Sequence, residues 1–244
     1  MIELERNALV WGIVGNLGGG KTLTAVHIAV SAMRDGCFVV SNVLLNMDLI
    51  CDSFGEYCRN LYRYVDLTES DPFTWECGDP RGSGGKRRVV VVLDECAEFF
   101  DQYSSTKDQV RTFMSWLRHS SKRSQDVILV VQRQEYLAKS VRSLVARWIW
   151  VDDLAVWRVP AIKIRLPFCG GLVMQNVFDR QGSRIQSASF LNKCFWGRFY
   201  DTAQIISVVN EGATFVYESP PSPQPSFFPV VFYVLSVFAL CFDI

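Results

Sequence analysis

The chain has 244 residues, 49% of them hydrophobic and 20% charged, which suffices for one large domain with an appendage and a substantial buried core. Lysine plus arginine equals aspartate plus glutamate, 25 each, so the zero net charge does not point to a nucleic-acid or acidic partner and leaves any basic surface local. The eight cysteines form no Cys-x-x-Cys pair, and both histidines lie far from any cysteine pair, which argues against a zinc site and for reduced thiols in a cytoplasmic domain.

The chain begins without a signal peptide, because residues 1–7 lack a long apolar stretch. Residues 8–14 predict a buried strand, and residues 23–33 place apolar side chains on one face at helical spacing. The sequence between them matches the P-loop pattern GxxxxGK(S/T) at every required position, in Gly15, Asn16, Leu17, Gly18, Gly19, Gly20, Lys21 and Thr22.

This glycine-rich stretch predicts a nucleotide site. Glycines allow backbone N–H groups to approach phosphate oxygens, and the following helix begins with its positive dipole end. We expect all eight residues to bind ATP, with Lys21 reaching the β- and γ-phosphates and Thr22 ligating Mg²⁺.

The next segments extend this unit into a parallel sheet. Asp35-Gly36 is typical of a helix end, and residues 37–40 predict a second buried strand, which completes a right-handed βαβ unit. Residues 61–65 alternate and predict another strand, whereas residues 68–87 predict a turn-rich surface excursion.

Five consecutive aliphatic residues at 89–93 predict a strand buried on both faces of a parallel sheet. Asp94 and Glu95 follow it, and after a P-loop this arrangement is typical of a Walker B element. Asp94 would then hold Mg²⁺, directly or through water, and Glu95 would polarise the water that attacks the γ-phosphate. The alternative is that Asp94 caps the next helix and Glu95 is solvated.

A helix is predicted over residues 107–120, and basic residues cluster at its end: Arg118, His119, Lys122 and Arg123. Cations are favoured at a helix C-terminus, which is one interpretation. The other is a basic edge that meets a neighbouring subunit's nucleotide or a nucleic acid.

Residues 126–131 predict another buried strand, which ends at Gln132. Ligands bind where parallel strands end, so we expect Gln132 to contact the γ-phosphate or its water as a sensor; a helix N-cap contact is the alternative. Residues 136–145 predict a helix with its inner face formed by Leu137, Val141, Leu144 and Val145.

A strand-rich section follows. Residues 147–152 predict a strand, and residues 155–166 and 172–178 predict a hairpin around a turn at 167–171. Its tryptophans, Trp148, Trp150 and Trp157, are a possible stacking platform for bases, but tryptophans in strands are more often core residues.

The C-terminal part differs in composition. Residues 220–225 predict a stiff polyproline linker, and residues 227–242 are apolar except for Tyr233 and Ser236. At 1.5 Å per residue such a helix spans about 24 Å, and the last two residues and a thin bilayer bring it close to the about 30 Å needed. We therefore predict an ATPase domain at 1–205, a linker at 206–226 and a transmembrane segment at 227–244, against a docking peptide or a truncated domain.

In this order, the motifs resemble the zonular occludens toxin-like (Zot) family, which includes the filamentous-phage assembly ATPase of the inner membrane. The resemblance covers roughly residues 8–202. It rests on the P-loop, residues 94–100, the Arg118-His119 pair, residues 126–132, Arg142-Ser-Leu144 and the aromatic segment 195–202.

The resemblance implies an α/β fold of the RecA and HerA-FtsK type. Its additional-strand parallel sheet is flanked by helices and followed by the hairpin section and the transmembrane helix. It also implies that Lys21 and Thr22 bind ATP and Mg²⁺, that Glu95 is the hydrolytic base, and that an arginine from a neighbouring subunit, either Arg118, Arg123 or Arg142, completes the site. With the strand-end residues added, we expect Lys21, Glu95 and Gln132 to be catalytic and Thr22 and Asp94 to hold Mg²⁺.

By the same resemblance the chain forms a homo-oligomeric ring at the host inner membrane, with its ATPase domain in the cytoplasm. It extrudes filamentous virions with phage assembly proteins and phage single-stranded DNA as partners. Two other functions remain open: a DNA-packaging or DNA-transfer ATPase, and a non-hydrolysing nucleotide-gated scaffold or toxin-like protein.

Overall fold

The computed structural model describes residues 9–66, 88–97, 107–154 and 171–200. The chain divides into two compact units, 1–204 and 205–244, and all described residues belong to the first. The expected surface excursion at 68–87, the strand at 155–166, Trp157, the linker and the segment 227–244 lie outside the described residues. Within the described ranges, no helix is long and apolar enough to cross a membrane.

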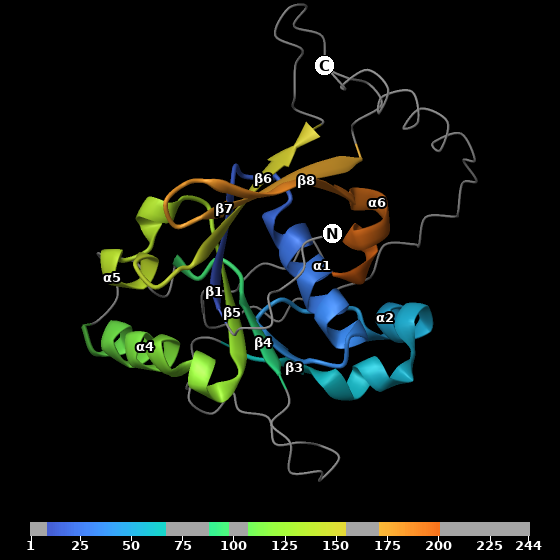
Figure 1. Cartoon of the computed structure of the whole chain (residues 1–244). Helices are drawn as coiled ribbons and strands as arrows, with labels where there is room; N and C mark the ends of the chain where they lie inside the picture. The colour runs from blue at the N-terminus through green and yellow to red at the C-terminus, as the bar shows by residue number, and fades with distance from the viewer. Residues whose placement is uncertain (1–8, 67–87, 98–106, 155–170, 201–244) are drawn as a thin grey trace, which may run out of the picture. The chain divides into compact units, whose positions relative to one another are not determined.

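One eight-stranded sheet organises the described residues (Figure 1), in the spatial order β3-β2-β4-β5-β1-β6-β7-β8. The strands are β1 (Val10–Gly15), β2 (Phe38–Ser41), β3 (Tyr62–Tyr64), β4 (Val89–Leu93), β5 (Gln125–Val131), β6 (Arg147–Asp153), β7 (Leu172–Asp179) and β8 (Arg184–Asn192). All pairs from β3 to β6 are parallel, and β7 and β8 join antiparallel. β5 therefore stands between the P-loop strand β1 and β4, as expected for an additional-strand sheet.

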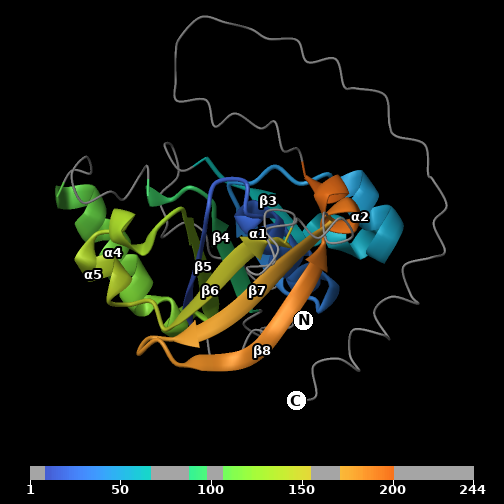
Figure 2. The ribbon, with the colours of Figure 1, turned by 90° about the horizontal axis from the view of Figure 1, so that it is seen from above.

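Helices cover both faces of this sheet (Figure 2), with α1 and α2 on one side and α4 and α5 on the other. They are α1 (Lys21–Arg34), α2 (Met47–Phe54), α4 (Lys107–His119), α5 (Lys139–Arg142) and α6 (Lys193–Trp196), with 3-10 turns η1 (Glu56–Leu61), η3 (Ser121–Arg123), η4 (Gln134–Tyr136) and η6 (Gly197–Phe199).

The aliphatic strands are buried on both faces, which confirms the prediction for β4 and β5. Val90 and Val92 of β4 join the core that includes α1, whereas Val91 and Leu93 join the core that includes α4 and α5. Both faces are covered, so alternation is absent and the strand appears as a continuous apolar run.

The predicted hairpin between 155–166 and 172–178 is wrong, because both edges of β7 are occupied by other strands. β6 pairs along one edge, from Arg147↔Asp179 to Asp153↔Val173. β8, which was not predicted, pairs along the other edge and forms the hairpin with β7.

The helix predicted over residues 136–145 is shorter in the structure. Leu137 and Ala138 have extended ψ angles of 139° and 138°, which separate the 3-10 turn η4 from the short α5. The burial prediction was nevertheless correct for Leu137, Val141 and Val145, because side chains of an irregular segment also cover the sheet. α2 was not predicted; its N-cap is Asn46, whose side-chain oxygen accepts a hydrogen bond from Leu49 N at 3.2 Å.

Candidate active site

The glycine-rich loop connects β1 to α1, and two of its glycines adopt left-handed backbone angles. Gly18 has φ +70° and Gly20 has φ +93°, conformations that L side chains rarely adopt. The loop is also tightly approached by backbone: a β-carbon on Gly15 would lie 2.3 Å from the carbonyl oxygen of Val151 on β6. The loop is therefore shaped by neighbouring strands as well as by its own glycines.

The Lys21 ammonium lies inside this loop, where its Nζ donates a 3.0 Å hydrogen bond to the carbonyl oxygen of Asn16. Burial lowers the pKa of Lys21, and the carboxylates of Asp94 and Glu95 partly oppose that shift. The two acids that follow β4 are thus close enough to Lys21 to act on its charge.

Asp94, directly after β4, contacts Thr22 in the first turn of α1. The Thr22 hydroxyl donates a 2.6 Å hydrogen bond to Asp94 Oδ2, and the Glu95 N–H donates one of 2.9 Å to Oδ1. Burial raises the pKa of the Asp94 carboxyl, although both hydrogen bonds oppose the shift. A buried carboxylate of this kind is stabilised by a bound cation.

This donor set fits Mg²⁺. A hydroxyl and one carboxylate are hard oxygen ligands, and magnesium in phosphate sites takes few protein ligands and fills the rest with waters and phosphate oxygens. In the parts of the chain that the structure describes, no cluster of three or more His, Cys, Asp and Glu side chains offers a cage for another metal.

Glu95 has φ +48°, one of two left-handed non-glycine residues in the described ranges. A glutamate in this conformation costs about 1 kcal/mol, and such strain is concentrated at functional sites. The next residue, Cys96, is fully buried and its N–H donates to Val130 O at 3.3 Å. The strained turn is thus fixed from both sides.

Asn42, at the end of β2, is a site residue that sequence reasoning missed. Its side-chain Nδ2 donates to the Asp94 carbonyl oxygen at 2.9 Å, while its Oδ1 accepts from the Asp94 N–H at 2.7 Å. The amide therefore positions the backbone of the residue that meets Thr22. The available signal was a polar residue directly after a buried strand, the same signal that indicated Gln132.

The remaining predicted residues divide between the two edges of the sheet. Gln132 is exposed and follows β5, whose parallel neighbours are β1 and β4, so it shares an edge with the P-loop and Asp94. Arg118 and Arg123 precede β5, which places them toward the opposite edge. Arg142 is half-buried in α5.

Of the two described tryptophans of the strand-rich section, only Trp148 is a core residue. A β-carbon on Gly12 would lie 2.2 Å from Trp148 Cζ3, so β1 needs a glycine beneath this ring. Trp150 is 47% exposed and contacts Phe178 edge-on, with ring centroids 6.2 Å apart.

A family model described as "Zonular occludens toxin (Zot)" matches residues 12–165, more than half of the chain. The chain belongs to the Zot family. The P-loop, the strand order and the Thr22–Asp94 contact agree with this membership, and the Zot-family chain is accordingly a P-loop ATPase.

Curated relatives of this Zot-family chain are phage proteins. The Gene 1 protein of Escherichia phage If1 is 25% identical over 229 residues, which cover 86% of this chain and 63% of the phage protein. The Gene 1 protein of Enterobacteria phage M13 is 25% identical over 166 residues, 67% of this chain and 45% of the phage protein. The chain thus spans less than two thirds of these relatives.

Among solved structures, the N-terminal domain of zonular occludens toxin from Neisseria meningitidis has a TM-score of 0.50 and 17% identity. The match covers 80% of this chain and 100% of that domain. This similarity supports the same fold.

Proposed function

We propose that the chain is a membrane-tethered motor that hydrolyses ATP to assemble filamentous virions and extrude them through the host inner membrane. The observation that carries the proposal is the 2.6 Å hydrogen bond between Thr22 and Asp94, directly beside the strained Glu95. Family membership and the phage Gene 1 relatives supply the biological context.

The loop amides of residues 15–22 and the Lys21 ammonium bind the phosphates of ATP in this proposal. Thr22 and Asp94 hold Mg²⁺, which when bound neutralises charge on the β- and γ-phosphates. The Glu95 carboxylate orients the attacking water and accepts its proton, and Gln132 orients the γ-phosphate or that water.

An arginine of a neighbouring subunit completes the site. Arg118, Arg123 and Arg142 are the candidates, and the position of the first two toward the sheet edge opposite the P-loop favours a contact with another subunit's nucleotide. Such sharing makes turnover depend on ring formation. Mixing Lys21→Ala chains with chains lacking one candidate arginine tests this, because active shared sites then form only from the mixed pair.

The membrane link rests on the sequence beyond the described domain. The proline-rich linker at 206–226 and the apolar residues 227–244 tether the cytoplasmic ATPase domain to the inner membrane in this proposal. Phage assembly proteins and phage single-stranded DNA are the proposed partners, with a second copy of this chain as the first of them.

The test is Mg²⁺-dependent ATP hydrolysis by the full chain, measured against protein concentration. Glu95→Gln removes the proposed base, and Glu135→Gln is the matched control because Glu135 is an exposed glutamate after β5. Turnover that rises steeply with concentration and disappears only in Glu95→Gln supports a ring ATPase with this base.

Two outcomes overturn the proposal in favour of the alternatives. ATP binding without turnover at any concentration indicates a non-hydrolysing scaffold. Turnover stimulated strongly by DNA, and lost when Arg118, Lys122 and Arg123 are neutralised, indicates a DNA-packaging or DNA-transfer ATPase.

A further inference from the structure

The segment from Asn42 to Asn46 begins at the Asp94 backbone and ends at Phe199 and Tyr200, the last described residues of the domain. At its start, the Asn42 amide makes two hydrogen bonds with the Asp94 backbone, 2.7 and 2.9 Å long. At its end, Asn46 N–H donates to the Phe199 carbonyl oxygen at 2.8 Å, and Leu45 forms an antiparallel bridge with Tyr200.

The middle of this segment is also fixed. Val43 N–H donates to the Ser41 hydroxyl at 3.0 Å, and the Tyr62 hydroxyl donates to the Val43 carbonyl oxygen at 2.5 Å. Val43 and Leu45 are buried in the core that includes α1. Asn42, Val43 and Leu45 of this segment are therefore held by hydrogen bonds or by core packing, which gives a continuous physical path from Asn42 to Asn46.

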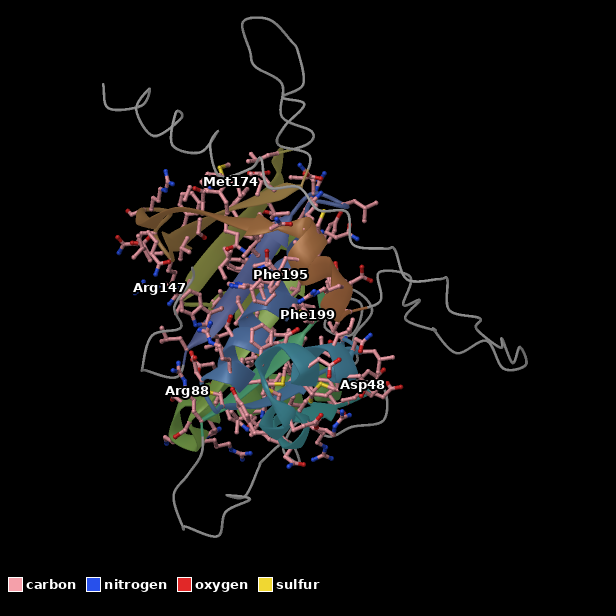
Figure 3. All side chains as sticks on the ribbon, turned by 90° about the vertical axis from the view of Figure 1, so that its right-hand side faces the viewer. Asp48, Arg88, Arg147, Met174, Phe195 and Phe199 are labelled. Atoms are coloured by element: carbon pink, nitrogen blue, oxygen red, sulfur yellow. The ribbon has the colours of Figure 1, made fainter. Side chains whose placement is uncertain are left out.

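The residues that pair with Leu45 and Asn46 pack on an aromatic cluster, which consists of the rings of Phe54, Phe195, Trp196 and Phe199. Phe199 is fully buried, with ring centroids 5.7 Å from both Phe54 and Trp196. Figure 3 shows Phe195 of α6 and Phe199 of η6, two consecutive helical turns, beside α1 and α2. Any movement of the Phe199 backbone would therefore also move this packed aromatic cluster.

Tyr200, which bridges to Leu45, is half-buried against the core that includes α1. Burial raises the pKa of the Tyr200 phenol to about 12, and the Asp94 carboxylate adds to the shift.

We propose that the Asn42–Asn46 segment couples the state of the metal site at Asp94 to the backbone of Phe199 and Tyr200. This coupling rests on the proposed function, in which Asp94 holds Mg²⁺. With Mg²⁺ held by Thr22 and Asp94, any displacement of the Asp94 main chain would pass to the Asn42 amide through its two hydrogen bonds and on to the bridge between Leu45 and Tyr200. Tyr200 stands immediately before the residues that lead to the predicted linker, so nucleotide state reaches the start of the proposed tether.

Hydrogen exchange of the full chain tests the coupling. ATPγS with Mg²⁺ should protect the amides of residues 15–22 and slow exchange at Asn46 roughly fivefold. ATPγS with EDTA should protect the P-loop without slowing Asn46. At ATPγS concentrations adjusted to give equal P-loop protection, Asn42→Ala should lose the Asn46 response. Asn192→Ala should keep it, because the Asn192 oxygen caps Phe195 N at 3.2 Å.

The outcomes separate this inference from the proposed function. Absence of P-loop protection overturns the nucleotide site itself, and the coupling with it. P-loop protection with an unchanged Asn46 amide overturns the coupling alone. An Asn46 response that persists in Asn42→Ala or in EDTA also overturns it. The EDTA comparison uses the unaltered chain, so the inference is decided even where Asn42→Ala fails to fold.

Discussion

Val173 lies against the α-carbon of Gly20, at the last glycine of the P-loop. A β-carbon on Gly20 would be 2.6 Å from Val173 Cγ2, and Gly20 has φ +93°. The glycine-rich loop is thus shaped by a strand of the antiparallel extension, far along the chain. Val151 of β6 contributes in the same way through its carbonyl oxygen beside Gly15.

Gly20→Ala should therefore impair the loop more than Gly18→Ala does. Gly18 also has a positive φ, +70°, but a β-carbon there meets nothing within 4 Å, so only backbone strain of about 1 kcal/mol is expected. Gly20→Ala adds a steric clash, for a total of roughly 2–4 kcal/mol in the free energy of unfolding and a loss of nucleotide affinity. Urea unfolding measures the loss of stability, and nucleotide titration measures the loss of affinity. Adding Val173→Ala to Gly20→Ala should relieve part of the clash. Equal losses at the two glycines would contradict this account.

Asp94→Asn should separate stability from metal binding. A carboxyl whose pKa is raised by folding binds its proton more tightly in the folded state. The folded chain without metal therefore loses stability as the pH rises above 3.8, the ordinary value for aspartate. Asn removes this penalty, so the metal-free variant should be as stable as wild type at pH 7 or more stable by about 1 kcal/mol.

The same variant should bind Mg²⁺ with ATP at least about 100-fold more weakly. Thermal unfolding with EDTA and Mg²⁺ titration of nucleotide binding give the two readouts. Asp52→Asn, at an exposed aspartate of α2, is the control that should change neither. A large loss of metal-free stability in Asp94→Asn would show that the carboxylate is needed for folding instead.

The sequence predicted the parallel half of the fold because its signals are local. The P-loop motif and the aliphatic runs of β1, β4 and β5 each carry their own pattern, and their order on the sheet follows from the additional-strand resemblance. Asp94, Glu95 and Gln132 end strands of this half, so their common edge was predictable as well. Their catalytic roles stay predictions.

The parts that were not predicted depend on contacts between distant segments. β8 lacks a strong apolar alternation, and its place beside β7 is determined by pairing. Asn42 belongs to the site because β2 lies next to β4, which brings its amide to the Asp94 backbone. The Val173–Gly20 contact has no local signature either, since it joins the antiparallel extension to the P-loop.

Gln175 should stabilise the packing of β7 and β8 against α1, close to the P-loop. It is fully buried on β7, where Nε2 donates to the Thr24 hydroxyl at 2.9 Å and Oε1 accepts from the Ser189 hydroxyl at 3.0 Å. Gln175→Leu leaves both hydroxyls without this partner, so we expect a loss of roughly 1–3 kcal/mol in the free energy of unfolding. Urea denaturation measures it, and Asn176→Leu on the opposite face of β7 is the control. Losses of equal size would assign the effect to the strand and not to the buried hydrogen bonds.

The two histidines of the chain should differ in their effect on stability at acid pH. His27 is buried on α1 with its ring 4.5 Å from that of Trp196, and burial lowers its pKa to about 4, with the Arg34 charge adding to the shift. The unfolded chain therefore takes up this proton first. Stability is fully present above about pH 6.5 and is lost as the pH falls toward 4, by up to about 3 kcal/mol.

Urea unfolding of His27→Phe between pH 4 and 7 should show this part of the pH dependence removed. Phe keeps a ring against Trp196 and does not titrate. His119→Phe is the matched control, because His119 is exposed at the end of α4 with Nδ1 2.7 Å from the Ser115 carbonyl oxygen. That variant should keep the wild-type slope. A slope that survives in His27→Phe would show that the acid sensitivity comes from groups other than the histidines.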